Sequence, residues 1–201
     1  MPTTGPSSPS FWDSVYQSGR APWDLGAPTP VFQRLIRSGQ YPPGKIIVLG
    51  AGRGHDAREF ARHSFTVTAI DFAAEAVQAM RDLAEPDAPI NALQADIFEL
   101  PHTFDAMFDY ALDYTCYCAI DPARREEYAD VVTCVVKPGG AYIHLAFPID
   151  EHKGGPPFAV SPDQIIALFE TRGFELQQRE SPPDSARGRR GKEELLIFCK
   201  R

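Results

Sequence analysis

The sequence has no surplus of positive charge. Its 201 residues include 20 lysines and arginines against 27 aspartates and glutamates, which gives a net charge of −7. Proteins that bind nucleic acid generally need a basic surplus to displace counterions from phosphates, so this balance argues against nucleic-acid binding. The one basic cluster, at residues 187–192, is interpreted as a solvated loop.

Long hydrophobic runs are also missing. No stretch approaches the roughly 18 apolar residues that a membrane-spanning helix needs, so no membrane association is expected. Residues 1–10 are rich in proline, serine and threonine, and they lack the apolar core of a signal peptide. We therefore expect residues 1–10 to form a disordered tail.

Cysteine is scarce. The four cysteines, Cys116, Cys118, Cys134 and Cys199, lack the paired spacing of a metal site. Three of them lie in apolar runs, where a free cysteine behaves as a small hydrophobic residue. This pattern predicts no metal site and indicates a reducing, cytoplasmic setting.

The sequence does contain a regular alternation of strand and helix patterns. We expect strands at residues 45–49, 65–71, 90–95, 108–113, 142–147, 174–180 and 194–200, and helices at residues 55–63, 73–83, 124–136 and 161–172. The turn at residues 137–140 is expected to stop the third of these helices. A length of 201 residues suits one domain but not two. We predict a single domain over residues 11–201, in which residues 11–44 precede the first strand as a lid.

The order of these elements predicts the fold class. Alternating strands and helices followed by a terminal hairpin indicate an α/β, doubly wound, mostly parallel seven-stranded sheet with an antiparallel C-terminal edge. In such a sheet, ligands bind beyond the carboxyl ends of the strands, where the strand order reverses.

A glycine-rich turn stands at that position. Gly50, Gly52 and Gly54 follow the first strand with G-x-G-x-G spacing. Glycines allow the sharp turn and let the backbone pass close to a ligand. The dinucleotide fingerprint G-x-G-x-x-G would need a glycine at position 55, where the sequence has His55. The spacing therefore favours S-adenosylmethionine, which carries no phosphate, over NAD.

Two acidic residues extend this predicted site. Asp71 ends the second strand, where a carboxylate can accept both hydroxyls of a ribose. Asp96 follows the third strand, where the edge of an adenine is expected to be read. A helix N-cap is the alternative interpretation of Asp96.

Four further segments complete a recognisable pattern. They read PWD at residues 22–24, CAIDPxR at 118–124, HKGGPPF at 152–158 and RGKE at 190–193. With the glycine turn and its His55-Asp56, they resemble the thiopurine, thiol and halide methyltransferase family, and most closely its plant and microbial thiol and halide branch. The likeness runs from about Phe11 to the C-terminus. It implies a class I methyltransferase fold, which is Rossmann-like, and S-adenosylmethionine as the cofactor.

The resemblance also implies roles for individual residues. The expected cofactor contacts are Trp12, Tyr16, Trp23, Gly50, Gly52, Asp71, Asp96, Ile97 and Asp113. Tyr16 departs from the plant pattern, which has tryptophan there. Tyr114 is expected near the methyl group. The expected acceptor pocket is lined by Phe11, Tyr114, Tyr117, Pro156, Pro157 and Phe158, with Cys116 and Cys118 nearby.

Trp23 can be read in two ways from the residues alone. Between Pro22 and Asp24, it can pack at the start of a helix. Because it precedes the first strand, it can instead act in a lid, where an aromatic face suits a sulfonium cation.

The sequence offers no convincing catalytic triad, which fits methyl transfer to a soft anion that needs no general base. We expect a small-molecule acceptor, such as a thiolate, thiocyanate or a halide. Arg124 is the candidate for attracting that anion or lowering the pKa of a thiol, and a solvated arginine on a helix face is the alternative. His152 is an alternative proton acceptor for a neutral thiol. A larger thiopurine-like or metabolite acceptor, and a binding protein without turnover, remain rival interpretations, and the oligomeric state is not indicated.

Overall fold

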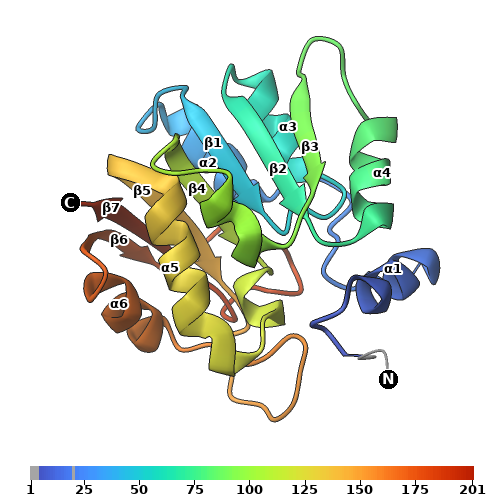
Figure 1. The fold of residues 1–201 in the computed structure, drawn as a ribbon. Helices are drawn as coiled ribbons and strands as arrows, with labels where there is room; N and C mark the ends of the chain where they lie inside the picture. Colours follow the sequence, from blue (N-terminus) through green and yellow to red (C-terminus); the bar gives the residue numbers. More distant parts are fainter. Residues whose placement is uncertain (1–4, 20) are drawn as a thin grey trace.

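The computed structural model describes residues 5–19 and 21–201, and it contains one seven-stranded sheet with helices on both faces (Figure 1). The strands are β1 (Lys45–Leu49), β2 (Thr66–Asp71), β3 (Ile90–Gln94), β4 (Phe108–Tyr114), β5 (Val136–Ala146), β6 (Phe174–Glu180) and β7 (Glu194–Lys200). Their order across the sheet is β3-β2-β1-β4-β5-β7-β6. The first five strands pair in parallel, while β7 is antiparallel to both β5 and β6. The predicted doubly wound sheet with an antiparallel C-terminal edge is confirmed.

The α-helices are α1 (Pro9–Gln17), α2 (Pro30–Ser38), α3 (His55–Arg62), α4 (Ala74–Asp82), α5 (Arg125–Val135) and α6 (Pro162–Glu170). Short 3-10 helices form at η1 (Ile97–His102), η2 (Tyr117–Ala119) and η3 (Pro122–Arg124). Apolar residues of α2, α3 and α4 pack with one face of the sheet, and those of α5 and α6 with the other. None of the helices in the described residues is long and apolar enough to cross a membrane.

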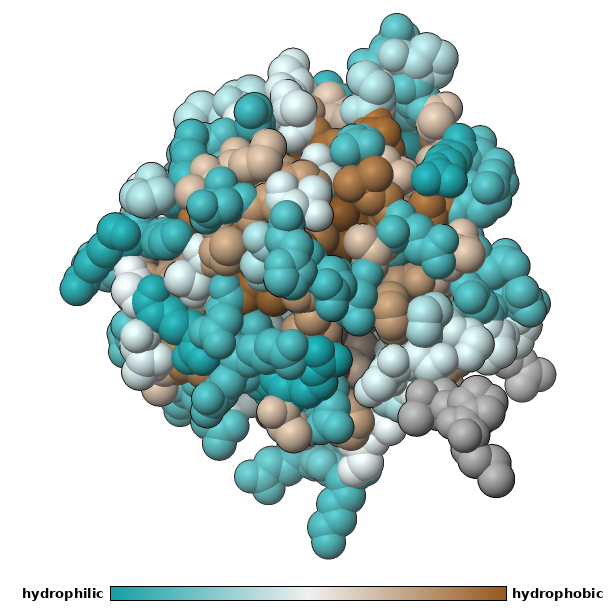
Figure 2. Space-filling model, viewed as in Figure 1, coloured by the Kyte–Doolittle hydropathy of each residue, from teal (hydrophilic) through white to brown (hydrophobic). Residues whose placement is uncertain are grey.

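Hydrophilic side chains cover most of the molecular face seen in Figure 2. Apolar side chains emerge there mainly over the β2–β3 end of the sheet. This distribution follows from the layered fold, since each helix turns its apolar stripe toward the sheet and its polar side toward water.

The N-terminal part differs from the expected tail and lid. Residues 1–4 of the expected tail lie outside the described residues, whereas residues 9 and 10 already belong to α1, which begins with Pro9 at its first position. The predicted lid, residues 11–44, also contains α2, whose Val31, Phe32 and Leu35 are buried against α3 and the sheet. The part that lies outside the sheet-and-helix body is therefore shorter, and residues 5–19 and 21–29 are called the lid below.

The lid is attached to the body at α4. The Asp13 carboxylate accepts a hydrogen bond from the backbone N–H of Glu75, and Gln17 donates to the Glu75 side chain at 2.8 Å. Ala73, at the N-cap of α4, makes no side-chain cap, so Asp13 satisfies one of the free N–H groups at this helix start. This contact places α1 beside α4, at the end of the sheet to which β1 and β2 point (Figure 1).

The start of β5 corrects the prediction for residues 137–140. The strand begins at Val136, directly after α5, and these residues lie inside it as an irregularity in its pairing with β4. Gly139 adopts a φ of +77°, and a side chain on Gly140 would lie 2.8 Å from the Asp109 carbonyl oxygen. The two glycines thus let the chain bulge without leaving the sheet.

Candidate active site

The glycine turn joins β1 to α3 through three residues in the left-handed region of backbone space. Gly50, Gly52 and Gly54 have φ values of +60°, +56° and +72°, which only glycine adopts without strain. A Cβ atom on Gly50 would lie 2.7 Å from Cβ of Cys116. The turn therefore passes directly over the segment that follows β4, and the two together form the floor of a cavity.

Asp71 lies at the end of β2 beside this turn. Its Oδ2 accepts the Gly52 N–H at 2.8 Å and its Oδ1 accepts the Ala73 N–H at 2.9 Å. The side chain lines the cavity although the residue is only 8% exposed, and burial raises its pKa to about 6, against these backbone hydrogen bonds. Each carboxylate oxygen has a second lone pair, so the group can also accept hydroxyl donors from a ligand.

The cavity has a volume of about 300 Å³ and lies at the carboxyl ends of β1, β2 and β4. Ten of the residues expected in the site line it: Trp12, Tyr16, Trp23, Gly50, Asp71, Asp96, Ile97, Arg124, Pro156 and Pro157. They come from the lid, the glycine turn, the ends of β2 and β3, and two loops. Segments that are far apart in sequence thus meet around one space large enough for a small-molecule ligand.

The aromatic residues of the lid form one packed group over this cavity. The ring centroids of Trp12 and Trp23 are 5.4 Å apart, and those of Tyr16 and Trp23 are 5.6 Å apart, both edge to face. The Trp23 indole N–H donates to the Tyr16 hydroxyl at 3.3 Å. The lid interpretation of Trp23 is the one that this geometry favours. Tyr16 joins the group although the plant pattern has a different residue there.

A second cavity of about 60 Å³ lies on the other side of Tyr16 and Trp23. Gly52 and Tyr114 line it, together with Asp24, His55 and Asp56. Asp24 pairs with Arg53 at 3.2 Å, and its other carboxylate oxygen lies 3.2 Å from Nε2 of His55, whose pKa burial lowers. The lid is thereby tied to the glycine turn through a carboxylate that is 12% exposed.

Asp96 is a helix cap, as one interpretation of its sequence position expects, and its place at the cavity leaves it available for the adenine contact that the other predicts. Its side chain accepts the Phe98 N–H at 3.0 Å and so caps η1, and it also lines the larger cavity. Nearby, the Arg124 guanidinium lies 3.4 Å from the centroid of the Phe98 ring and is paired with Glu127 at 2.8 Å. Arg124 therefore reaches the cavity, but a neighbouring carboxylate already balances its charge.

Four of the expected site residues line neither of these cavities. Asp113 is fully buried beneath the turn after β4, where it accepts the N–H groups of Cys116 and Tyr117 and the Tyr128 hydroxyl. The geometry thus gives Asp113 a structural task instead of a ligand contact. The Tyr117 ring packs in the core, with its centroid 5.5 Å from that of Tyr128.

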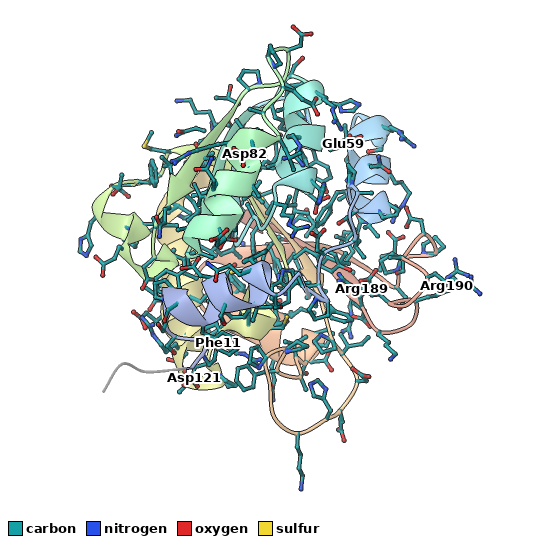
Figure 3. All side chains as sticks on the ribbon, turned by 90° about the vertical axis from the view of Figure 1, so that its right-hand side faces the viewer. Phe11, Glu59, Asp82, Asp121, Arg189 and Arg190 are labelled. Atoms are coloured by element: carbon teal, nitrogen blue, oxygen red, sulfur yellow. The ribbon has the colours of Figure 1, made fainter. Side chains whose placement is uncertain are left out.

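Phe11 and Phe158 are kept from the cavity by their own neighbours. The half-buried Phe11, labelled on α1 in Figure 3, packs its ring edge to face on Trp12. The Phe158 N–H donates to the Cys118 carbonyl oxygen at 2.7 Å, and its ring lies against Gly155. It is Pro156 and Pro157 of this loop that reach the cavity.

The structure also places residues in the site that the sequence did not assign to it. Cys116 and Cys118, expected only nearby, line the cavity directly, as does Phe147 after β5. Burial raises the pKa of Cys118 to about 12 and the pKa of Cys116 well above its usual value, so both are neutral thiols. Phe147 directly follows the last residue of β5, and this position at a strand end is the sequence signal that could have assigned it to the site.

No group of three or more histidine, cysteine, aspartate or glutamate side chains within the described part of the chain is placed to hold a metal ion. The cavity lining instead suits an organic ligand that carries cationic groups, since its carboxylates outnumber its one arginine and aromatic rings lie beside them.

Comparison with known proteins decides the family. A model of the family described as thiopurine S-methyltransferase (TPMT) matches residues 7–196. The chain belongs to this family. It is 36% identical over 174 residues to a probable thiol methyltransferase 2 of Arabidopsis thaliana, covering 84% of this chain and 75% of that protein. It is 32% identical over 187 residues to thiocyanate methyltransferase 1 of Brassica oleracea, covering 92% and 82% respectively.

Solved structures show the same fold in more distant methyltransferases. The 1,6-didemethyltoxoflavin-N1-methyltransferase of Burkholderia thailandensis, solved with S-adenosylhomocysteine, has a TM-score of 0.73 at 20% identity, covering 96% of this chain and 86% of that chain. This thiopurine S-methyltransferase family member is an S-adenosylmethionine-dependent methyltransferase with a class I, Rossmann-like fold.

The residues around the larger cavity fit this cofactor. The glycine turn leaves room for a ligand to approach the backbone, Asp71 offers buried acceptor oxygens beside that turn, and three aromatic rings lie over the space. S-adenosylmethionine supplies the methyl group when it is bound. The chain's own residues have to hold it, exclude water and align an acceptor.

Proposed function

We propose that this enzyme methylates a small soft nucleophile, namely a thiol or thiolate, thiocyanate or a halide. One observation carries the proposal: beside its acidic residues, the cavity has a group of lining residues made up of Phe147, Cys116, Cys118 and Pro156-Pro157. These groups are apolar or neutral. They provide no proton acceptor, which a soft anion does not need. The names of the plant relatives point to the same class of acceptor.

Within this proposal the cofactor contacts are Trp12, Tyr16, Trp23, Gly50, Gly52, Asp71, Asp96 and Ile97. Asp71 accepts the ribose hydroxyls through the lone pairs that Gly52 and Ala73 leave free. The lid rings cover the cofactor, and their faces suit a sulfonium. Tyr114 and Arg124 stay as catalytic candidates, with Pro157 as an acceptor contact.

The apolar walls at the acceptor end favour the reaction because charge is neutralised as the transition state forms. An anionic acceptor and a sulfonium neutralise each other as the transition state forms, so a pocket poor in water avoids stabilising the separated ions. Holding the reactants in line is worth up to about 7–11 kcal/mol in well-oriented models. A lid that closes over the site and rigid prolines at its other wall serve both effects.

His152 does not support a general-base alternative. It does not line the cavity, and its Nδ1 and Nε2 lie 3.1 Å and 2.9 Å from the carbonyl oxygens of Asp150 and Pro157. The hydrogen bond to Pro157, the larger cause, and the one to Asp150 raise the pKa of the imidazole. Each ring nitrogen already faces a backbone carbonyl oxygen of its own loop, so neither is directed at an acceptor in the cavity.

We also propose a reducing, cytoplasmic location, supported by the free state of all four cysteines, two of which line the cavity. A disulfide or an oxidised sulfur there would change the wall that the acceptor contacts.

The test is an acceptor panel with labelled S-adenosylmethionine, preceded by calorimetry with S-adenosylhomocysteine. Iodide, thiocyanate, hydrosulfide, an aryl thiol, an alkyl thiol and a thiopurine cover the range. We expect binding of S-adenosylhomocysteine and the highest kcat/KM with one of the small soft anions or thiols. The highest kcat/KM with the thiopurine would favour the larger-acceptor alternative, and binding without turnover would favour a sensor. Absence of binding would overturn the proposal altogether.

A further inference from the structure

Arg189 lies inside the molecule although it belongs to the loop between β6 and β7. The residue is 6% exposed, whereas its neighbour Arg190 is exposed and points away from the body (Figure 3). The Arg189 Nη2 donates to the backbone carbonyl of Trp23 at 2.6 Å. This finding corrects the interpretation of residues 187–192 as a uniformly solvated loop.

The same guanidinium touches two walls of the site. Its central carbon lies 4.7 Å from the ring centroid of Tyr114 and 4.8 Å from that of Phe147. Tyr114 lines the smaller cavity and Phe147 lines the acceptor end of the larger one. One side chain therefore joins the lid to the strand ends of β4 and β5.

Two acidic residues near the buried guanidinium offset part of its charge. Glu193 is 1% exposed and accepts the Tyr114 hydroxyl at 2.6 Å, and Asp56 lies close enough for Arg189 to lower its pKa, against the larger opposing effect of burial. Burying a guanidinium costs several kcal/mol unless charges and hydrogen bonds surround it. Neither Nη1 of Arg189 nor Oε1 of Glu193 has a hydrogen-bond partner. Burying Arg189 in this way costs free energy that anchoring the loop alone would not require.

The segment that Arg189 contacts needs outside support. Among the described residues between α1 and α2, none belongs to a helix or strand. Side chains tie this stretch to the body: Asp24 pairs with Arg53 and His55, and Thr29 donates to Asp56 from its N–H at 2.6 Å and its hydroxyl at 2.9 Å. Arg189 adds a tie at Trp23, which like Tyr16 lines both cavities.

We propose that Arg189 is a positioning residue that holds the lid closed over the cofactor cavity and connects this closure to the Phe147 wall of the acceptor end. The inference rests on the proposed function, since it takes the larger cavity as the cofactor site. It assigns to the C-terminal loop a part in cofactor retention.

The expected effect follows from the population of the closed lid. When only the closed form binds well, the apparent Kd equals the intrinsic Kd divided by the fraction closed. Loss of a hydrogen bond from a charged donor shifts such an equilibrium by roughly tenfold to a hundredfold. We therefore expect Arg189→Met to weaken binding of S-adenosylhomocysteine by about that factor, and Arg189→Lys, which keeps the charge and one donor, by less.

The experiment compares Arg189→Met with Arg190→Met, its exposed neighbour. Calorimetry gives the Kd for S-adenosylhomocysteine, and intrinsic fluorescence reports the lid directly because the only two tryptophans, Trp12 and Trp23, lie in it. We expect the fluorescence of ligand-free Arg189→Met to differ from that of the wild type, while Arg190→Met matches the wild type in both measurements. In kinetics, the KM for S-adenosylmethionine should rise more than kcat falls.

The outcomes separate the two proposals. A wild-type protein that does not bind S-adenosylhomocysteine overturns the proposed function. A wild type that binds, with Arg189→Met equal to Arg190→Met, overturns the role of Arg189 alone. If Arg189→Met does not fold, hydrogen exchange of the wild type decides the question: ligand-induced protection of both the lid and residues 181–193 supports the link, and protection of the lid alone overturns it.

Discussion

At Asp71, burial and hydrogen bonding act on the same carboxylate in opposite directions. Burial raises its pKa to about 6, while the N–H groups of Ala73 and Gly52 lower it. The group is thus ionised at neutral pH and stays responsive to its surroundings near pH 6. A carboxylate in this state can strengthen its hydrogen bonds when a ligand supplies hydroxyl donors.

We expect Asp71→Asn to weaken binding of S-adenosylhomocysteine by about 2 kcal/mol, or roughly thirtyfold, because hydrogen bonds to a charged acceptor are lost. The amide also brings an N–H group toward a backbone donor at Gly52 or Ala73. Calorimetry measures the affinity, and denaturant unfolding measures the accompanying loss of stability. Asp82→Asn, at the exposed end of α4, is the matched control and should leave affinity unchanged. Equal affinities of the two variants would remove Asp71 from the cofactor site.

Arg124 differs from Asp71 because its charge is paired with the carboxylate of Glu127. The ion pair is 38% and 51% exposed at its two side chains, so it is screened by solvent and salt. If Arg124 attracts an anionic acceptor, Glu127→Gln should lower the KM for thiocyanate several-fold, and Arg124→Met should raise it. The effect should shrink at high ionic strength. A neutral acceptor in the same assay serves as the control. Unchanged KM in both variants would mean that Arg124 only packs on Phe98.

At the scale of elements, the sequence predicted best where a local pattern and the tertiary structure agree. The strand at β1, the glycine turn and the start of α3 lie where the pattern placed them, because a buried strand and positive φ values both have local signals. The helix expected from residue 161 begins where predicted for the same reason, since the Ser161 side chain caps α6 by accepting the Gln164 N–H. The prediction of a turn at residues 137–140 was wrong because a Pro-Gly-Gly sequence usually ends a helix or strand. Here pairing with β4 keeps these residues inside β5.

The turn between β4 and η2 depends on a buried carboxylate. Asp113 accepts two backbone N–H groups and the Tyr128 hydroxyl, and it lies below Cys116 and Cys118. We expect Tyr128→Phe to reduce the free energy of unfolding by about 1–3 kcal/mol, because it removes a donor from a buried charge. Urea denaturation measures this.

If Tyr128→Phe affected only the core, it would lower the stability and leave catalysis unchanged. Because the turn carries the thiols that line the cavity, kcat/KM for the acceptor should also fall more than the affinity for S-adenosylhomocysteine. The control Tyr41→Phe removes a hydroxyl that accepts a hydrogen bond from the exposed Gln40 side chain, and it should show neither effect. Full stability of Tyr128→Phe would show that Asp113 does not need this donor.

At the scale of the whole molecule, the site is closed by the two ends of the chain. The lid comes from the N-terminal residues and Arg189 from the loop before β7, so Trp23 and Arg189 meet across 166 residues of sequence. No local pattern encodes such a contact. This is why the floor of the site, built from consecutive strand ends, was predictable, while the closure by Arg189 and the inward turn of Asp113 were not.

Buried ionisable groups also give the whole molecule a pH dependence in its ligand-free state. Burial raises the pKa values of Asp56, Asp71 and Asp113 to about 6 from 3.8, so between about pH 4 and 6 the folded chain holds protons that the unfolded chain releases. Their contribution to stability is therefore lost as the pH rises through 6. His144 acts oppositely, since burial lowers its pKa to about 3 and stability is lost below pH 6.5. Three carboxyls against one imidazole leave a net slope of up to about 3 kcal/mol per pH unit.

Cofactor binding should run against that trend, because the form of Asp71 that accepts ribose hydroxyls is the ionised one. We expect the Tm of the ligand-free protein to fall between about pH 4.5 and 6.5, while the increase in Tm caused by a fixed concentration of S-adenosylhomocysteine grows over the same range. The affinity gain approaches tenfold per pH unit below pH 6 at most. Thermal unfolding with and without the ligand measures both quantities in one series. Asp71→Asn should flatten the ligand-induced part and leave the slope from Asp56 and Asp113. A ligand effect that is constant or declines with rising pH would contradict the role given to Asp71.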